Sequence, residues 1–233
     1  MTSLLATAFR AATGLSDQRG LLLDLDGTLA DSLGALSQVY ERFLSSVGRE
    51  GEGSNAEFNT LNGLRLDDIV AHLQQAHHIE GSSADDLLSL YRDLLARGML
   101  TVQPAPGAAQ LLHAARLNGW ATCVVTSARS DEARRWLGKT GLNSLVLHVV
   151  GGEMVANGKP DPECYRTGLT LCDAVPGASI AVEDSALGAE SAIAAGVRTF
   201  FIVPDGGACG PAAPLGTAGV VSHLRDVERE LGR

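Results

Sequence analysis

The chain has 233 residues, of which 45% are hydrophobic and 19% charged, and its formal net charge is −9. This composition is typical of a globular protein and excludes a disordered chain. The acidic balance argues against a protein that binds duplex nucleic acid through a basic face. It leaves an anionic small-molecule substrate open, because a local cation or metal can reverse the field in one cleft.

No apolar run approaches the ~20 residues of a membrane span, and the start of the chain lacks the pattern of a signal peptide. None of the four cysteines forms a CxxC pair, and a reducing compartment is the simplest setting for them. We therefore expect a cytoplasmic protein with a small-molecule partner and without a nucleic-acid or membrane partner. The sequence predicts no particular oligomeric state.

Short apolar runs alternate with helical patterns along most of the chain. The runs that predict strands are residues 21–23, 121–125, 145–150, 179–182 and 197–203. The patterns that predict helices between and after them are residues 107–118, 130–138, 162–172, 185–195 and 222–231, with a loop at 204–219. Gly119 and Gly196 follow two of these helices, and Ser130 is a candidate N-cap. The alternation predicts an α/β fold with a parallel sheet covered on both faces.

Residues 31–104 break this alternation, because they contain helical patterns and no good strand. Apolar residues recur at helical spacing over 33–47, 66–73 and 87–95. Ser83 precedes the last of these, with Asp86 three residues on, which resembles a capping box. We therefore predict a helical domain at 31–104, inserted into a core domain formed by residues 1–30 and 105–233.

Two aspartates follow the first predicted strand, in the sequence Leu-Asp24-Leu-Asp26-Gly27-Thr. On an extended chain, residues at i and i+2 point the same way, and open α/β sheets bind ligands at the carboxyl ends of their strands. Gly27 frees the backbone to turn and to approach an anion. The alternative interpretation of these residues alone is a solvated acidic turn.

Three further segments place polar groups at comparable positions. Thr126 and Ser127 follow the second strand, and a hydroxyl there can donate to a phosphoryl oxygen. Lys159 lies between a glycine and a proline, where an ammonium suits a phosphate. Glu183 and Asp184 follow another strand and offer oxygen ligands suited to Mg²⁺. Taken singly, Thr126 also fits a turn, Lys159 an exposed lysine, and Asp184 a helix N-cap. Because all these segments bring polar groups to comparable positions, together they predict one site.

The same segments resemble the four motifs of the haloacid dehalogenase superfamily, specifically its phosphatase branch with a helical cap. The matching residues are DLDGTLADS from Asp24 to Ser32, Thr126, Lys159 within GKPDP, and Glu183-Asp184 within VEDSALG. Order and spacing fit over residues 20–205. The resemblance implies a Rossmann-like parallel sheet core with an inserted α-helical cap domain.

The resemblance also implies roles. Asp24 attacks phosphorus and forms an aspartyl phosphate, while Asp26 acts as acid and then as base. Mg²⁺ is held by the side chains of Asp24 and Asp184 and by the backbone carbonyl of Asp26, with Glu183 either a ligand or acting through water.

The phosphoryl oxygens of the substrate are held, in this resemblance, by four residues. Thr126 and Lys159 contribute their side chains, and the backbone amides near Gly27 and Ser127 contribute hydrogen bonds. The helical cap closes over the site, excludes water and supplies the groups that select the substrate.

Departures from related branches narrow the activity. Asp26 disfavours carbon–halogen cleavage, and residues 31–104 contain no lysine for a Schiff base. Sugar phosphomutases carry a histidine where Leu36 aligns. We therefore predict a Mg²⁺-dependent phosphatase of a small phosphorylated metabolite, of phosphoglycolate or sugar-phosphate type. The alternatives are a sugar phosphomutase of the β-phosphoglucomutase type and a non-catalytic phosphate-binding regulatory protein. Residues 62–65 of the cap resemble the substrate-specificity loop of this group. Within it, Arg65 is a candidate cap residue for a second anionic group, or else a solvated arginine at a helix start.

Overall fold

The computed structural model describes residues 18–203 and 212–232. Its centre is a six-stranded parallel sheet with the strand order β3-β2-β1-β4-β5-β6. The strands are β1 (Gly20–Leu23), β2 (Ala121–Val125), β3 (His148–Val150), β4 (Ile180–Glu183), β5 (Arg198–Ile202) and β6 (Gly219–Val221). The first strand in the chain therefore lies inside the sheet, between β2 and β4.

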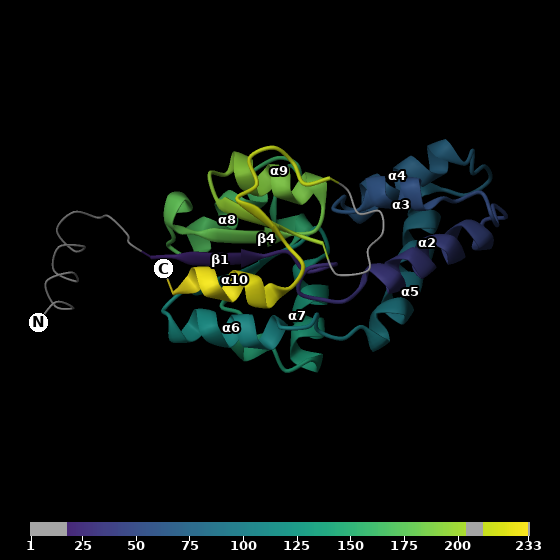
Figure 1. Ribbon diagram of the computed structural model, residues 1–233. Helices are drawn as coiled ribbons and strands as arrows, with labels where there is room; N and C mark the ends of the chain where they lie inside the picture. The colour runs from purple at the N-terminus through teal and green to yellow at the C-terminus, as the bar shows by residue number, and fades with distance from the viewer. Residues whose placement is uncertain (1–17, 204–211, 233) are drawn as a thin grey trace, which may run out of the picture.

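Helices cover both faces of this sheet, as Figure 1 shows. One face carries α6 (Ala108–Leu117), α7 (Ser130–Lys139) and α10 (Leu224–Leu231), and the other carries α8 (Glu163–Leu171) and α9 (Ala186–Ala194). Successive side chains of a strand point to opposite faces. Accordingly, Leu21 and Leu23 are buried in one hydrophobic cluster and Leu22 in the other. This two-sided burial explains why β1 is a continuous apolar run.

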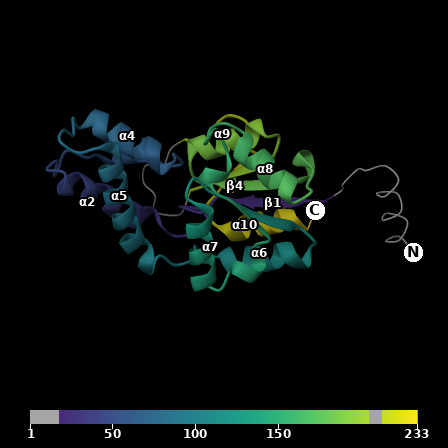
Figure 2. The same cartoon turned by 180° about the vertical axis from the view of Figure 1, so that it is seen from behind.

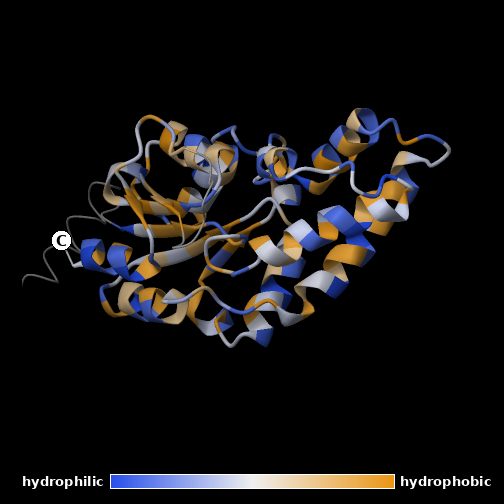
Figure 3. Cartoon of the chain, turned by 45° about the vertical axis from the view of Figure 1, so that its right-hand side comes forward, coloured by the Kyte–Doolittle hydropathy of each residue, from blue (hydrophilic) through white to orange (hydrophobic). Residues whose placement is uncertain are grey.

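The cap lies at one end of the sheet, on the side of the strands' carboxyl ends (Figures 1 and 2). It consists of α2 (Leu33–Ser46), α3 (Asn55–Leu61), α4 (Leu66–Ala76) and α5 (Ala84–Gly98), followed by the 3-10 helix η1 (Met99–Thr101). These helices enclose a hydrophobic cluster of their own, visible as orange inner faces in Figure 3. The two connections to the core run side by side, with Asp31 N donating to Gln103 O and Ala105 N donating to Leu29 O.

The predicted fold class, a parallel α/β sheet with an inserted helical cap, is confirmed. Several elements differ in detail. Helix α3 and strand β6 were not predicted, and only the last part of the predicted strand 145–150 pairs with the sheet. The start of the predicted loop 204–219 lies outside the described residues. Short 3-10 helices fill three connections: η2 (Asn143–Leu145), η3 (Gly152–Met154) and η4 (Pro176–Ala178).

Two of the predicted helix caps have different outcomes. The Ser83 side chain accepts a hydrogen bond from Asp86 N, as the capping pattern predicts. Ser130, in contrast, is the first helical residue of α7 rather than its N-cap, because Arg129 occupies that position. Ser130 donates instead to the Glu153 carboxylate, through both its backbone N–H and its hydroxyl. Over the part of the chain that the structure describes, no helix is long and apolar enough to cross a membrane.

Candidate active site

Three adjacent strands deliver polar side chains to one edge of the sheet. Asp24 follows β1, Thr126 follows β2 and Asp184 follows β4. Because β1 lies between β2 and β4 and the strands are parallel, these residues meet at the carboxyl edge of the sheet, where such folds bind ligands. All three side chains are buried beneath the cap.

Lys159 reaches this edge from the loop before α8. Its Nζ donates to Asp24 Oδ1 at 2.6 Å, to Glu183 Oε1 at 2.5 Å and to Val125 O at 3.3 Å. Burial alone would lower the pKa of Lys159, but the charges of Asp24 and Glu183 outweigh it and hold the pKa above its ordinary value. The buried lysine is therefore a fixed ammonium beside Asp24.

Glu183 is the anchor of that lysine. Its Oε1 also accepts a hydrogen bond from the Tyr165 hydroxyl at 2.6 Å, and its Oε2 accepts one from the Ser185 hydroxyl at 3.3 Å. Burial raises the pKa of Tyr165, with the Glu183 charge adding to the effect, so the phenol keeps the proton that it donates. Both carboxylate oxygens of Glu183 therefore accept hydrogen bonds, and Lys159 is one of the donors.

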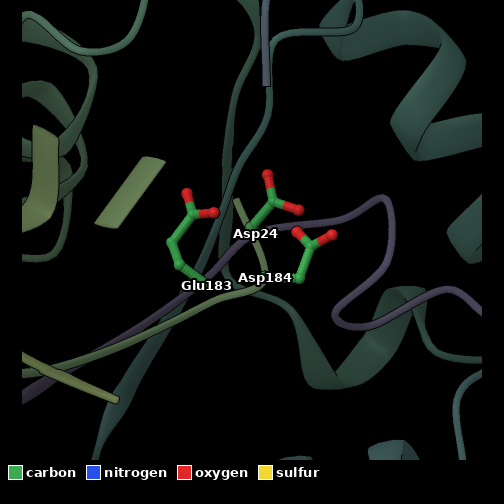
Figure 4. A group of neighbouring side chains, drawn as sticks. All are labelled: Asp24, Glu183 and Asp184. Carbon is green, nitrogen blue, oxygen red and sulfur yellow. The ribbon is translucent and has the colours of Figure 1, made fainter. Parts of the chain in front are cut away.

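Asp24, Glu183 and Asp184 form a compact group of carboxylates (Figure 4), with one oxygen of each lying within 4.8 Å of the others. Burial, with the charge of Glu183 adding to it, raises the pKa of Asp184 to about 7. Burial also raises the pKa of Asp24, against the lowering effect of Lys159. Three carboxylates facing one ammonium leave excess negative charge, and oxygen ligands of this kind suit a hard divalent cation. The donor set therefore fits Mg²⁺.

Asp26 lies beside this group and lines the same cleft. Its Oδ1 is buried without a hydrogen-bond partner among the described residues, which is an expensive state for a carboxylate unless a ligand or a proton satisfies it. Burial raises the pKa of Asp26, while a hydrogen bond with the Ser32 side chain lowers it. A carboxyl with a raised pKa in a cleft is a candidate proton donor.

The predicted phosphate-binding residues lie at the site in different ways. Thr126 and Ser127 line the cleft, and Lys159 lies behind Asp24. The Thr126 hydroxyl accepts a hydrogen bond from Ala128 N at 3.0 Å. Gly27 N donates within its own turn, to Ala30 O and to Ser32 Oγ. The structure has no room for a side chain at Gly27, because a Cβ there would lie 2.1 Å from Asp184 Oδ2.

The segment from Asn62 to Arg65 joins the cap to the core at three points. Asn62 Nδ2 donates to Asp184 Oδ2 at 2.8 Å, and the Ser127 hydroxyl donates to Gly63 O at 2.6 Å. Arg65 Nη1 donates to the carbonyl of Ala156, in the loop that leads to Lys159, at 3.3 Å. We call residues 62–65 the cap latch. With the latch engaged, a cleft of about 620 Å³ lies between cap and core and is lined by Asp24, Asp26 and Asp184.

Two residues of the site carried no prediction of an individual role, although Asn62 belongs to the segment 62–65 that resembles a substrate-specificity loop. Tyr165 lies in the first turn of α8, where helical periodicity identifies only a core position, and nothing local marks it as the partner of Glu183. Asn62 lies in the cap, 122 residues from Asp184. In both cases the contact arises only when distant elements come together.

His72 of α4 and His77, the residue that follows this helix, both contact Glu57. His77 is buried, and its Nε2 lies 2.9 Å from Glu57 Oε2, while its Nδ1 lies 3.4 Å from Glu52 Oε2. His72 Nε2 lies 3.2 Å from the other oxygen of Glu57. Glu57 belongs to α3, the helix that the sequence did not reveal, so its pairing with the histidines was equally hidden.

Comparison with known proteins agrees with this fold. Residues 21–202 match the model of the family described as haloacid dehalogenase-like hydrolase. Because the match spans most of the chain, this protein belongs to that family and is a hydrolase.

Individual relatives are similar over most of their length. The chain is 30% identical to hexitol phosphatase A of Escherichia coli strain K12, over 79% of this chain and 82% of the relative. It is also 30% identical to the plasmid-encoded phosphoglycolate phosphatase of Cupriavidus necator, over 88% of this chain and 89% of the relative. A solved haloacid dehalogenase-family hydrolase from Deinococcus radiodurans R1, with bound phosphate and sodium, is 25% identical and superposes with a TM-score of 0.70, covering 94% of this chain and 98% of its own.

Proposed function

We propose that the protein is a Mg²⁺-dependent phosphatase that hydrolyses a small phosphorylated metabolite through an aspartyl phosphate. The observation that carries the proposal is the convergence of Asp24, Asp26 and Asp184 at one end of a cleft, with Lys159 hydrogen-bonded to Asp24 from behind. The relatives named as hexitol and phosphoglycolate phosphatases support phosphate esters of this size, and they make phosphoglycolate and sugar phosphates the first substrates to test.

The metal-binding residues in this proposal are Asp24, Asp184 and the backbone carbonyl of Asp26. Glu183 completes the acidic group, and its hydrogen bonds to Lys159, Tyr165 and Ser185 favour a role in holding the lysine over direct coordination. When bound, Mg²⁺ supplies positive charge that reduces the repulsion between the carboxylates and an anionic phosphoryl group.

The chemistry then divides between the two aspartates. A carboxylate oxygen of Asp24 attacks phosphorus, the bond from phosphorus to the ester oxygen breaks, and the proton of Asp26 goes to the departing oxygen. Asp26 next takes a proton from the water that attacks the aspartyl phosphate, which releases inorganic phosphate and restores the Asp24 carboxylate. Lys159 stays charged throughout and orients Asp24 from behind.

Specificity groups come from the cleft walls. Thr126 and the backbone amide of Ser127 lie where they can donate to phosphoryl oxygens in this proposal. Arg65 lines the cleft, but its guanidinium is already bonded to the Ala156 carbonyl and to Asp68, with Nε 3.3 Å from Asp68 Oδ2. A second anionic group of the substrate would have to compete with Asp68 for the Arg65 guanidinium.

The direct test is release of inorganic phosphate from an aryl phosphate and from a panel of metabolite phosphates, with and without Mg²⁺. We expect turnover that requires Mg²⁺ and that Asp24→Asn abolishes. Asp93→Asn, at an exposed aspartate of α5 that does not line the cleft, is the matched control and should keep full activity. Folded protein that is inactive on the whole panel, or an Asp24→Asn variant with full turnover, would refute the proposal.

The same assay separates hydrolysis from phosphoryl transfer. A phosphatase releases inorganic phosphate in proportion to the ester consumed, whereas a mutase returns the phosphoryl group to another hydroxyl of the sugar. Leu36 stands where mutases carry a histidine, and its side chain offers neither a proton nor a hydrogen bond. We therefore expect stoichiometric release of phosphate from sugar phosphates.

A further inference from the structure

The cleft extends well beyond the phosphoryl site, toward the connections between cap and core. Its volume of about 620 Å³ lies in the range of ~300–1,000 Å³ typical of sites for drug-sized ligands, and a two-carbon phosphoester would leave much of it unfilled. On the hinge side its wall is formed by the apolar side chains of Leu36, Leu95, Met99, Leu100 and Trp136. We call these five residues the apolar arm.

Contacts between elements place the arm residues together. A Cβ on Gly98, the neighbour of Met99, would lie 2.7 Å from Val39 Cγ2, so α5 passes close to the α2 turn that carries Leu36. Trp136 Nε1 donates to Val102 O at 3.2 Å, and Lys139 Nζ donates to Leu100 O, which ties α7 to η1. Leu95 and Met99, four residues apart, lie on one face of their helical segment.

Leu36 links this arm to the reacting end of the cleft. Its backbone N–H donates to Ser32 O at 2.9 Å, so Leu36 lies one helical turn beyond the residue whose side chain bonds Asp26. It is half-buried, yet it belongs to none of the three hydrophobic clusters found among the described residues. An apolar side chain that lines a cleft without joining a core is available to a ligand.

The arm is present while the cap latch is engaged, so it is not merely the space left by a detached cap. Residues 62–65 contact the core on one side, and the two connections between cap and core are hydrogen-bonded to each other on the other side. The charged side chains that line the cleft near the arm, Arg92, Glu132, Arg135 and Lys139, are exposed to solvent. Solvent hydrates these charges, and Lys139 also donates to Leu100 O. Leu36 and Leu100, which lie outside the hydrophobic clusters of the described residues, gain from contact with an apolar ligand.

We propose that the substrate is a phosphate monoester whose leaving group carries an apolar hydrocarbon portion, and that this portion binds the apolar arm beside Asp26. The inference rests on the proposed phosphatase function and specifies its substrate class. Asp26 protonates the ester oxygen, so the group attached to that oxygen lies on the Asp26 side, next to Leu36. A fully hydroxylated leaving group would find no hydrogen-bond partners among the five arm side chains, apart from the indole N–H that Val102 already occupies.

A homologous series of primary n-alkyl phosphates, from ethyl to hexyl, tests this. Their leaving alcohols differ little in acidity, so a change in kcat/KM reports binding of the chain. Burial of each methylene should raise kcat/KM roughly fourfold until the arm is filled, and sorbitol 6-phosphate should fall below hexyl phosphate. Leu36→Asn and Leu100→Asn should both reduce the ratio of hexyl to ethyl kcat/KM. Leu117→Asn, at a leucine of α6 that is 87% exposed and outside the cleft, should leave this ratio unchanged.

The outcomes separate this inference from the proposed function. If ethyl phosphate is hydrolysed and kcat/KM does not rise with chain length, the phosphatase stands and the apolar arm is overturned as a substrate site. If no ester is hydrolysed, the phosphatase fails. Calorimetric titration with ethyl-to-hexyl phosphonates in Mg²⁺ then decides the arm: affinity that grows with chain length and is lost in Leu36→Asn supports it, and constant affinity refutes it.

Discussion

Asp26 is the residue whose surroundings say most about the chemistry. Its Oδ1 has no partner among the described residues, and burial raises its pKa, so a proton can be held there and given to a leaving oxygen. Asp26→Asn should therefore slow turnover of alkyl esters by about 10²–10⁴-fold. With an activated aryl phosphate, whose leaving phenolate needs no proton, the first turnover should slow much less. Rapid-quench measurement of the first turnover with both esters checks this.

Hydrolysis of the aspartyl phosphate, the second step of the reaction, provides the control for this prediction. Without a base for the attacking water, the aryl ester should produce a burst of phenol followed by slow turnover, with phosphoenzyme accumulating. An equal loss in the first turnover with alkyl and aryl esters would contradict proton donation to the leaving group. It would indicate instead that the substitution disturbs the geometry of Asp24.

The residues at this edge of the sheet could be located from sequence because each follows an apolar strand directly. Asp24, Thr126 and Asp184 inherit their position from β1, β2 and β4, and parallel strands align their carboxyl ends. The contact of Tyr165 with Glu183 depends on helix packing, and the contact of Asn62 with Asp184 depends on where the cap lies. Neither contact leaves a local pattern in the chain. The roles of the site residues stay predictions, which the variants described above can test.

Helix α9 leaves room for the Glu183 carboxylate because residue 188, which faces it, is a glycine. A Cβ on Gly188 would lie 2.1 Å from the carboxylate carbon of Glu183, which in turn holds Lys159. Gly188→Ala should displace that carboxylate, lower kcat and destabilise the protein by about 1–3 kcal/mol through overpacking. Thermal unfolding and steady-state kinetics measure the two effects.

The same substitution in α7 is the control. A Cβ on Gly138 meets nothing within 4 Å, so Gly138→Ala should stabilise the protein by about 0.5–1 kcal/mol through helix propensity with no effect on kcat. If the two variants behave alike, the contact between Gly188 and Glu183 does not limit the site.

Helix α3 is fixed to its neighbours mainly by Glu57. This carboxylate accepts a hydrogen bond from Tyr40 of α2 and contacts His72 of α4 and His77, the residue after α4. Burial raises its pKa, but the bonds from Tyr40 and His77 outweigh that effect and lower it. A carboxyl with a depressed folded-state pKa stabilises the fold above its unfolded pKa, and this contribution is lost as the pH falls through the folded pKa.

Glu57→Gln should therefore cost about 1–3 kcal/mol at pH 7 and should flatten the loss of stability below about pH 5. Urea unfolding followed by circular dichroism at several pH values measures both. Glu50→Gln, at an exposed glutamate in the connection between α2 and α3, should change neither the stability at pH 7 nor its acid dependence. An unchanged acid slope in Glu57→Gln would show that other groups carry the acid dependence.

The elements that sequence analysis missed share a cause. Helix α3 has seven residues and one buried side chain, and glycines precede it, so no apolar period marks it. Strand β6 has three residues at the sheet edge and follows a segment rich in glycine and proline. Both depend on tertiary contacts rather than on local pattern. In contrast, the long cap helices and the buried strands carry enough periodicity to be identified. The predicted domain boundaries at residues 30/31 and 104/105 stay a prediction.

At the scale of the whole molecule, the cap latch is one of the contacts between cap and core, and its close fit depends on a glycine. Gly63 has φ +91°, and a Cβ there would lie 2.7 Å from the Ser185 hydroxyl of the core. Gly63→Ala should therefore push the cap away from the core. We expect a higher KM, a larger radius of gyration by small-angle X-ray scattering, and faster hydrogen exchange around Ser127, which loses its bond to Gly63 O.

Gly81 separates this steric effect from backbone strain. It is also in the cap and has φ +80°, but a Cβ there would meet nothing within 4 Å. Both alanine variants should lose about 1–2 kcal/mol from the left-handed backbone conformation, while only Gly63→Ala should alter KM and the radius of gyration. Equal effects on KM would mean that cap stability, rather than latch contact, controls substrate binding. No effect of Gly63→Ala on KM would mean that the latch is not engaged during turnover.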